Sequence, residues 1–273
     1  MADEKNLGAI MCPNCGRLIS ARAERCIYCD TRKPNLWGFS SVLRALFGGQ
    51  TSLIPVIVTA CVSLYVLSLL LDPSSISQST GILGLLPPSF SVLKKLGMTG
   101  VLPITYGRWW TLITAIYLHG SLLHIVFNVL WIRQLGPQVE ELYGISRSFL
   151  IFTIAGIVGF VVSSLAKHAY TLGASGSIFG LLGALVYYGR KRGGTFGAAI
   201  LRHWGQWAAV LFILGFFVPI IDNYAHGGGF VGGYLAANAL GFVELKRESR
   251  SNQMLALGAL GLTVVAFLLC LLS

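Results

Sequence analysis

The chain has 273 residues, of which 55% are hydrophobic and only 11% are charged, and its mean hydropathy is +0.72. A water-soluble protein of this length would have too little polar surface to cover such a composition, which therefore indicates an integral membrane protein. The net charge of +10 does not favour nucleic-acid binding, because the basic residues are scattered in short groups between apolar runs.

Four of the six cysteines lie near the N-terminus in two Cys-x-x-Cys pairs, Cys12 with Cys15 and Cys26 with Cys29. This spacing is typical of a tetrahedral zinc site, so we expect one structural Zn²⁺ in a small zinc ribbon over residues 1–35. Disulfides or idle thiols are the alternative, but the topology below places this segment in the reducing cytoplasm. Because so short a segment forms little core, metal binding would supply most of its folding free energy.

Seven apolar segments follow, each close to the roughly 20 residues that cross about 30 Å of hydrocarbon as a helix. They lie at residues 52–71, 112–132, 148–166, 173–189, 204–221, 225–243 and 254–272. The first is long enough to span and begins too late for a signal peptide, so we expect it to remain as an anchor. The sequence therefore predicts an all-α polytopic membrane protein.

The basic residues are distributed unequally between the two sides of the predicted helices. If the N-terminus is cytoplasmic, 16 of the 20 basic residues lie inside, and only Lys94, Lys95, Arg108 and Lys167 lie outside. This bias predicts a cytoplasmic N-terminus and an outside C-terminus. The outside segment 72–110 is itself apolar, so we expect it to rest in the outer interface rather than form a disordered polar loop.

Two reactive side chains lie inside predicted membrane helices. Ser175 is two residues into the fourth segment and His226 is one residue into the sixth. Both segments enter from the outside, so the two residues lie at matching depth, where Ser175 would be the nucleophile and His226 its base. Taken alone, the serine motif is more often packing, and a lone histidine could bind a carbonyl or gate an ion path. Their combination is what indicates hydrolysis.

Glycines near these residues explain how the two helices could meet. Gly176 and Gly180 are four residues apart on the fourth segment, as are Gly229 and Gly233 on the sixth. Each pair leaves a helix face without side chains, where backbones can approach closely. The fourth segment, 173–189, is also short, at roughly 25 Å, so its N-terminus should begin in a recess filled by water.

The second segment offers further polar groups. His124 and Asn128 are four residues apart on one helical face, and their donors could stabilise an oxyanion together with the backbone N–H of Ser175. His119 precedes His124 by five residues, so we expect it to point elsewhere and order the outer end of the helix. We expect Asp222 to cap the sixth helix rather than complete a catalytic triad.

With these residues placed, the chain resembles the rhomboid family of intramembrane serine proteases over about 108–233. The motifs that carry the resemblance are Gly173-Ala174-Ser175-Gly176, His226 with Gly229 and Gly233, His124 with Asn128, and Gly136 with Glu140 and Gly144. The order Arg108-Trp109-Trp110 departs from the family's usual pair in the first outside loop. Phe179 stands where a tyrosine often packs on the histidine, which keeps the ring and loses the hydroxyl.

The resemblance implies a Ser175–His226 dyad with no carboxylate third member, and an oxyanion site formed by His124 and Asn128. It also implies cleavage of transmembrane protein substrates near the outer surface of the bilayer, without a cofactor for catalysis. A non-catalytic relative that binds transmembrane segments is one rival, although such proteins usually lack the serine or the histidine. A channel is another, but its polar residues would continue through the bundle.

The resemblance further implies a six-helix rhomboid core, which we place at 52–243. A linker at 36–51 would join it to the zinc ribbon, and 244–273 would form a second linker and an additional C-terminal transmembrane helix. We expect a multi-pass protein of a bacterial inner membrane, with lipid and membrane-protein substrates as partners and no nucleic acid.

Overall fold

The computed structural model describes the chain at residues 9–12, 17–20, 23–28, 52–79, 81–218, 221–244 and 249–272. The chain divides into two compact units, Met1–Ser52 and Leu53–Ser273. In the first unit, strands β1 (Ala9–Met11) and β2 (Leu18–Ser20) pair antiparallel.

Two of the predicted zinc ligands lie in the described part of the N-terminal unit. Cys12 directly follows β1, and its side chain is buried with those of Ile19 and Cys26 in one small cluster. Cys12 and Cys26, one from each Cys-x-x-Cys pair, are therefore brought together beside the strand pair. Cys15 and Cys29 lie outside the described residues.

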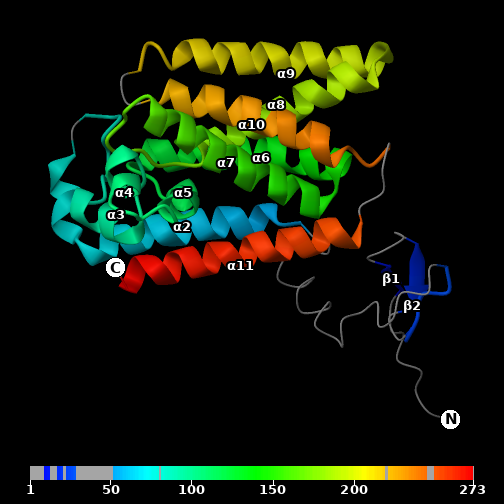
Figure 1. Ribbon diagram of the computed structural model, residues 1–273, viewed down its shortest axis with the longest axis horizontal. Coiled ribbons are helices and arrows are strands. Elements are labelled where there is room, and N and C mark those ends of the chain that lie inside the picture. Colours follow the sequence, from blue (N-terminus) through cyan, green and yellow to red (C-terminus); the bar gives the residue numbers. More distant parts are fainter. Residues whose placement is uncertain are drawn as a thin grey trace. The chain divides into compact units, whose positions relative to one another are not determined.

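The described part of the second unit contains seven helices of 18 residues or more, and each predicted segment overlaps one of them. They are α2 (Ile54–Leu71), α6 (Leu122–Tyr143), α7 (Ile145–Leu165), α8 (Ser175–Arg192), α9 (Gly194–Leu214), α10 (Asn223–Leu240) and α11 (Arg250–Leu272). Within the described residues, α2, α7 and α11 are each long and apolar enough to cross a membrane, and α6 joins them when taken with the short helices before it. Helices α7, α8 and α10 pack together at the centre of this unit (Figure 1).

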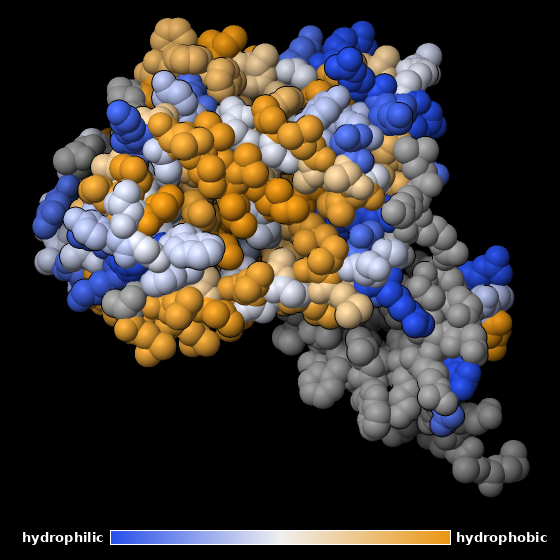
Figure 2. All heavy atoms as spheres, viewed as in Figure 1, coloured by the Kyte–Doolittle hydropathy of each residue, from blue (hydrophilic) through white to orange (hydrophobic). Residues whose placement is uncertain are grey.

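The surface of the helical unit is that of a protein embedded in a bilayer. Apolar side chains cover the middle of the face shown in Figure 2, and hydrophilic side chains gather at its two ends. Many large apolar side chains of α9 and α11 are exposed, among them Val210, Ile213, Leu257 and Leu262. Such a band matches the hydrocarbon layer, where helices satisfy their own backbone hydrogen bonds.

The second predicted segment, 112–132, is wrong as a single straight helix. Its first part folds as α5 (Thr111–Thr114) and η3 (Ala115–Tyr117), and the chain then turns by 91° into α6. Ser121 begins the new helix, because its hydroxyl accepts a hydrogen bond from the His124 N–H at 3.3 Å. Hydropathy continues across this bend and therefore does not reveal it.

The fifth predicted segment, 204–221, is displaced along the chain. Helix α9 begins ten residues earlier, at Gly194, and ends at Leu214 with Gly215 as its C-cap. The sequence places the start later because Arg202 and His203 interrupt the apolar run before Trp204. The end was misplaced because Phe216 and Phe217 are apolar, although they lie in a turn.

The segment between α2 and α5 is folded, so a disordered loop is wrong for its described residues. It forms η2 (Pro73–Gln78), α3 (Phe90–Leu96) and α4 (Val101–Thr105). Its apolar side chains make a small core of their own, consisting of Val92, Leu93, Leu96 and Met98 with Leu118.

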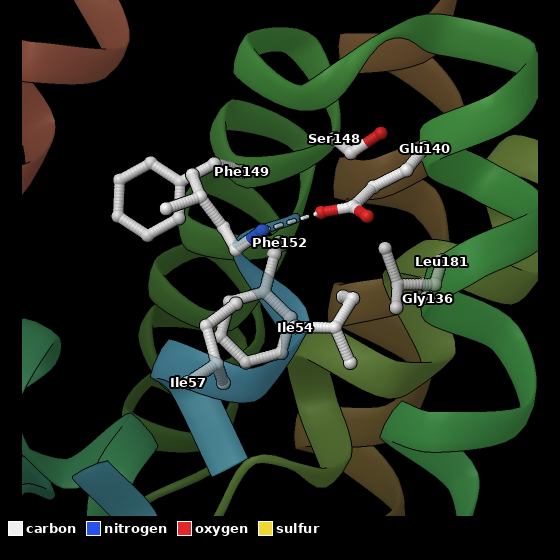
Figure 3. A pocket seen from close by; sticks show the side chains of 9 residues that line it. Ile54, Ile57, Gly136, Glu140, Ser148, Phe149, Phe152 and Leu181 are labelled. Atoms are coloured by element: carbon white, nitrogen blue, oxygen red, sulfur yellow. Dashed lines mark hydrogen bonds between the residues drawn. The ribbon is translucent and has the colours of Figure 1, made fainter. Parts of the chain in front are cut away.

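Glu140 has a structural role at the end of the unit where α2 begins. Its Oε1 accepts a hydrogen bond from the backbone N–H of Leu53 at 2.9 Å, beside a small pocket lined mainly by apolar side chains (Figure 3). A Cβ atom on Gly136, one turn earlier, would lie 2.3 Å from Cδ1 of Ile54. Gly136 and Glu140, two residues of the Gly136–Glu140–Gly144 motif on α6, therefore hold the start of α2 in place.

Candidate functional site

Ser175 is the first residue of α8, and a glycine turn places it there. Gly173 has φ of +119°, a conformation that residues with a Cβ rarely adopt. The Gly173 N–H donates to the carbonyl oxygen of Ala115 at 2.9 Å, which fixes the turn to η3. The Ser175 side chain is half-buried at the helix N-terminus, where backbone N–H groups have no intrahelical acceptor.

Helices α8 and α10 touch backbone to backbone beside this turn. A Cβ atom on Gly229 would lie 2.1 Å from the carbonyl oxygen of Gly176, and one on Gly233 would lie 2.1 Å from that of Gly180. No side chain fits at either contact. The expectation that these two glycine faces meet is therefore confirmed, and it brings the first turns of both helices together.

His226 lies in the first turn of α10 with its side chain buried. Its ring stacks on that of Phe179, with 4.2 Å between centroids and 17° between planes. Phe179 is one turn after Ser175 on the same face of α8, so the imidazole lies against the turn that carries the serine. Within the described part of the chain, Nδ1 of His226 is buried without a hydrogen-bond partner.

Asp222 caps α10, as the sequence predicts, and does not orient His226. Its Oδ1 accepts from the Ala225 N–H at 3.0 Å. Its Oδ2 accepts from the Ser163 hydroxyl, from Thr171 Oγ1 at 2.9 Å and from His168 Nδ1 at 3.1 Å.

The hydrogen bonds to Asp222 also set its ionisation. Burial raises the pKa of this carboxyl group, but the hydrogen bonds from Ser163, the Ala225 N–H, Thr171 and His168 outweigh burial and lower the pKa overall. The carboxylate therefore stays ionised and ties the start of α10 to α7 and to the loop before α8.

His124 presents a donor to the serine turn. Its Nδ1 accepts the Gly120 N–H at 3.3 Å, so a neutral ring carries its proton on Nε2. A Cβ atom on Gly173 would lie only 2.5 Å from that Nε2. Asn128, one turn later, donates from Nδ2 to the His124 carbonyl oxygen at 2.7 Å, and its amide keeps a second N–H.

The expectation that His119 points elsewhere is wrong. Its ring is buried against that of His124, with 5.1 Å between centroids and 67° between planes. Helix α6 begins only at Leu122, so His119 lies in the bend before the helix and not on a helical face. Within the described residues, neither of its ring nitrogens has a hydrogen-bond partner.

Sequence reasoning missed four residues that support the site. Ser163 and Thr171 reach Asp222 across 59 and 51 residues of sequence, His168 also binds it, and Ala115 acts through its backbone carbonyl. No sequence pattern indicates a contact of this kind. In the described part of the chain, no group of three or more histidine, cysteine or acidic residues is placed to hold a metal ion.

These features define a polytopic helical membrane protein with a serine and two histidines at one end of its central helices. A Rhomboid domain matches residues 106–242. The chain is 42% identical over 142 residues to rhomboid protease GluP of Bacillus subtilis (strain 168), covering 50% of this chain and 27% of that protein. It is 35% identical over 177 residues to RHOMBOID-like protein 1 of Arabidopsis thaliana, covering 60% of this chain and 42% of that protein.

The chain belongs to the rhomboid family. It is also 30% identical over 168 residues to putative rhomboid protease YdcA of Bacillus subtilis (strain 168), covering 60% of this chain and 82% of that protein. The chain spans about a quarter to a half of the length of several curated relatives, such as 27% of GluP and 42% of RHOMBOID-like protein 1.

Proposed function

We propose that the protein is an intramembrane serine endopeptidase with Ser175 as nucleophile and His226 as general base. The observation that carries the proposal is the stacking of the His226 ring on the Phe179 ring, whose centroids lie 4.2 Å apart. Phe179 follows Ser175 by one turn of α8. This contact holds the imidazole against the first turn of α8. Hydrogen bonds at catalytic dyads often tighten only when substrate binds, so proximity and orientation are the relevant properties of the free enzyme.

The reaction follows from these two groups. Ser175 Oγ attacks the carbonyl carbon of a peptide bond while His226 takes the hydroxyl proton. The imidazolium then protonates the leaving amine, and the carbon–nitrogen bond breaks to leave an acyl-enzyme. Water, deprotonated by His226, attacks the ester and releases the new carboxyl end, with the proton returned to Ser175 Oγ. No carboxylate third member takes part, because Asp222 is occupied as a helix cap.

The negative charge that develops on the carbonyl oxygen needs donors. His124 Nε2–H is aimed at the Gly173 turn, and the Ser175 backbone N–H lies at a helix N-terminus. Asn128 would contribute its second amide N–H from the next turn of α6. These three donors come from two different helices, which suits an oxygen positioned between α6 and α8.

The substrates we propose are transmembrane segments of other membrane proteins. Two relatives, GluP and YdcA, are named as rhomboid proteases. The candidate site of this chain lies at the ends of membrane helices rather than in a water-soluble domain, so a substrate would have to reach it within the membrane. We place the N-terminus in the cytoplasm of a bacterial inner membrane and the site near the outer surface, because 16 of the 20 basic residues would then lie inside.

The experiment that tests this function is cleavage of a transmembrane reporter by purified protein in proteoliposomes. Wild type should cut the reporter, and Ser175→Ala and His226→Ala should each reduce cleavage to background. Ser177→Ala is the matched control, because Ser177 is fully buried two residues away and faces Gly156. Cleavage by Ser175→Ala at the wild-type rate would refute the proposal and favour a non-catalytic role in binding membrane segments.

We also propose that the N-terminal unit is a zinc ribbon with Cys12, Cys15, Cys26 and Cys29 as ligands. The residues present fit the metal, since Cys12 and Cys26 are buried together beside Ile19 at the strand pair. Four thiolates would close a tetrahedral structural site, and the ion would supply folding free energy rather than chemistry. The ribbon would not take part in peptide cleavage.

A further inference from the structure

Helix α11, the additional C-terminal helix, has one buried edge and a broad exposed surface. Its buried residues are Asn252, Ala256, Thr263, Ala266 and Cys270. Residues between them, such as Leu262, Val265 and Leu268, are exposed. The buried edge packs against α7 and α5, so in the helical unit α11 lies beside the segment that precedes the α6 bend.

The last two turns of α11 contact that segment directly. Cys270 Sγ lies 3.8 Å from Thr114 Oγ1, and Thr114 donates in turn to the Gly97 carbonyl oxygen at 2.8 Å. The ring of Phe267 packs on that of Tyr117, with 6.1 Å between centroids. Both ends of the Thr114–Tyr117 stretch are therefore held from the same side.

This stretch also supports the catalytic residues. The Ala115 carbonyl, between Thr114 and Tyr117, accepts the N–H of Gly173 at 2.9 Å and so fixes the turn before Ser175. A Cβ atom on Gly156 of α7 would lie 2.6 Å from Ile116 Cδ1, so Ile116 is wedged against α7. After Tyr117 the chain turns into α6, which carries the oxyanion residues.

We propose that α11 positions the active site, with Phe267 and Cys270 as positioning residues that act through Thr114–Tyr117 on the Ser175 turn. The proposal rests on the function proposed above. A three-residue 3₁₀ helix such as η3 has too few internal hydrogen bonds to hold its own place, so its position depends on what packs against it. A displacement of about 1 Å at a catalytic group can reduce turnover about a hundredfold.

The contact itself is tested by cross-linking in the membrane. A Thr114→Cys variant should form a disulfide between position 114 and the native Cys270 when oxidised in proteoliposomes, because Thr114 Oγ1 and Cys270 Sγ lie 3.8 Å apart. The variant Thr114→Cys with Cys270→Ser should form none. Failure of the first variant to cross-link would overturn the proposed placement of α11.

The effect of α11 on catalysis is tested by comparing Phe267→Ala with Leu268→Ala, since Leu268 is an exposed neighbour of Phe267 on the same helix. We expect Phe267→Ala to lower kcat about tenfold with little change in KM. Phe267→Tyr, which keeps the ring, and Leu268→Ala should each keep the wild-type kcat. The thermal midpoint of each variant is measured in parallel, and kcat is determined well below it, so that a lower kcat does not reflect unfolded protein. If Phe267→Ala retains wild-type kcat while Ser175→Ala is inactive, the positioning role is wrong and the protease function stands. If Ser175→Ala cleaves as well, the proposed function fails, and the positioning role that depends on it fails too.

Discussion

The aromatic ring of Phe179 lies parallel to the imidazole of His226, with centroids 4.2 Å apart and planes 17° apart. The histidine has no carboxylate partner on Nδ1 within the described residues, so this stacking and the backbone around it set the orientation of the ring. The ring of Phe212 packs edge-on against Phe179 from α9, at 6.4 Å. A nucleophile and base without a third member depend on such packing for their geometry.

Replacing Phe179 with alanine should therefore impair catalysis more than binding. We expect Phe179→Ala to reduce kcat about 10- to 100-fold, because the imidazole loses the surface that orients it. Phe179→Tyr keeps the ring and should retain most of the activity. Steady-state cleavage of a transmembrane reporter measures both, and wild-type kcat in Phe179→Ala would show that stacking does not orient the base.

Loss of an oxyanion donor should appear in kcat. We expect His124→Ala to lower kcat about 10²- to 10³-fold with a small change in KM, as is typical when one donor to a developing oxyanion is removed. Val126→Ala is a suitable control, because Val126 is exposed on the same helix. Equal effects of the two substitutions would argue that His124 only supports packing.

The backbone contact between α8 and α10 should tolerate no side chain at Gly229. A methyl group there would lie 2.1 Å from the Gly176 carbonyl oxygen, so Gly229→Ala should cost about 1–3 kcal/mol through overpacking. At Gly227, two residues away, the nearest atom to such a methyl group would be Phe212 Cε2 at 3.6 Å, an ordinary contact. Thermal unfolding in detergent should therefore show a clear loss for Gly229→Ala and little change for Gly227→Ala.

The carboxylate of Asp222 should make the stability of the folded protein depend on pH. The pKa of Asp222 is lower in the folded protein than in the unfolded chain. The carboxylate therefore contributes fully to the free energy of unfolding above the usual carboxyl pKa of about 3.9, and this contribution is lost as the pH falls toward the lower pKa of the folded protein. Asp222→Asn keeps a capping oxygen but removes the charge, so we expect a loss of about 1–3 kcal/mol at pH 7.

The test of the Asp222 prediction is the difference in unfolding midpoint between wild type and Asp222→Asn, measured from pH 7 downward. This difference should shrink as the pH falls below about 4, because wild type then loses the same interaction. A difference that stays constant over this range would mean that the charge contributes nothing.

The N-terminal unit should hold one zinc ion per chain. Replacing Cys12 with serine removes a thiolate ligand, so elemental analysis in reducing buffer should show the zinc lost or greatly reduced. Cys61→Ser is the control, because Cys61 is buried in the helical unit and should leave the zinc content unchanged. Absence of zinc from wild type would refute the site.

Much of the helical unit could be predicted because its signals are local. The apolar length of each segment, the cap at Asp222 and the glycine pairs that bring α8 and α10 together are all visible in short stretches of sequence. The bend before α6 was not, because hydropathy does not report backbone direction. His119 was misplaced for the same reason, since helical spacing was applied across a bend. The early start of α9 was not visible either, because Arg202 and His203 interrupt its apolar run.

The support around the site could not be predicted because it joins distant parts of the chain. Ser163 and Thr171 bind Asp222 from two other segments, and a backbone carbonyl at Ala115 holds the turn before Ser175. Backbone groups carry no residue-specific signal. The reactive residues themselves could be proposed from sequence because their chemistry is distinctive in an apolar helix.

Whether His226 activates Ser175 as a nucleophile is tested by labelling the protein in membranes with a serine-directed fluorophosphonate and locating the adduct by mass spectrometry. We expect one adduct on Ser175 in wild type, none on the neighbouring Ser177, and a rate of labelling that falls to background in His226→Ala. No adduct on Ser175 in wild type, or labelling of His226→Ala at the wild-type rate, would contradict this expectation.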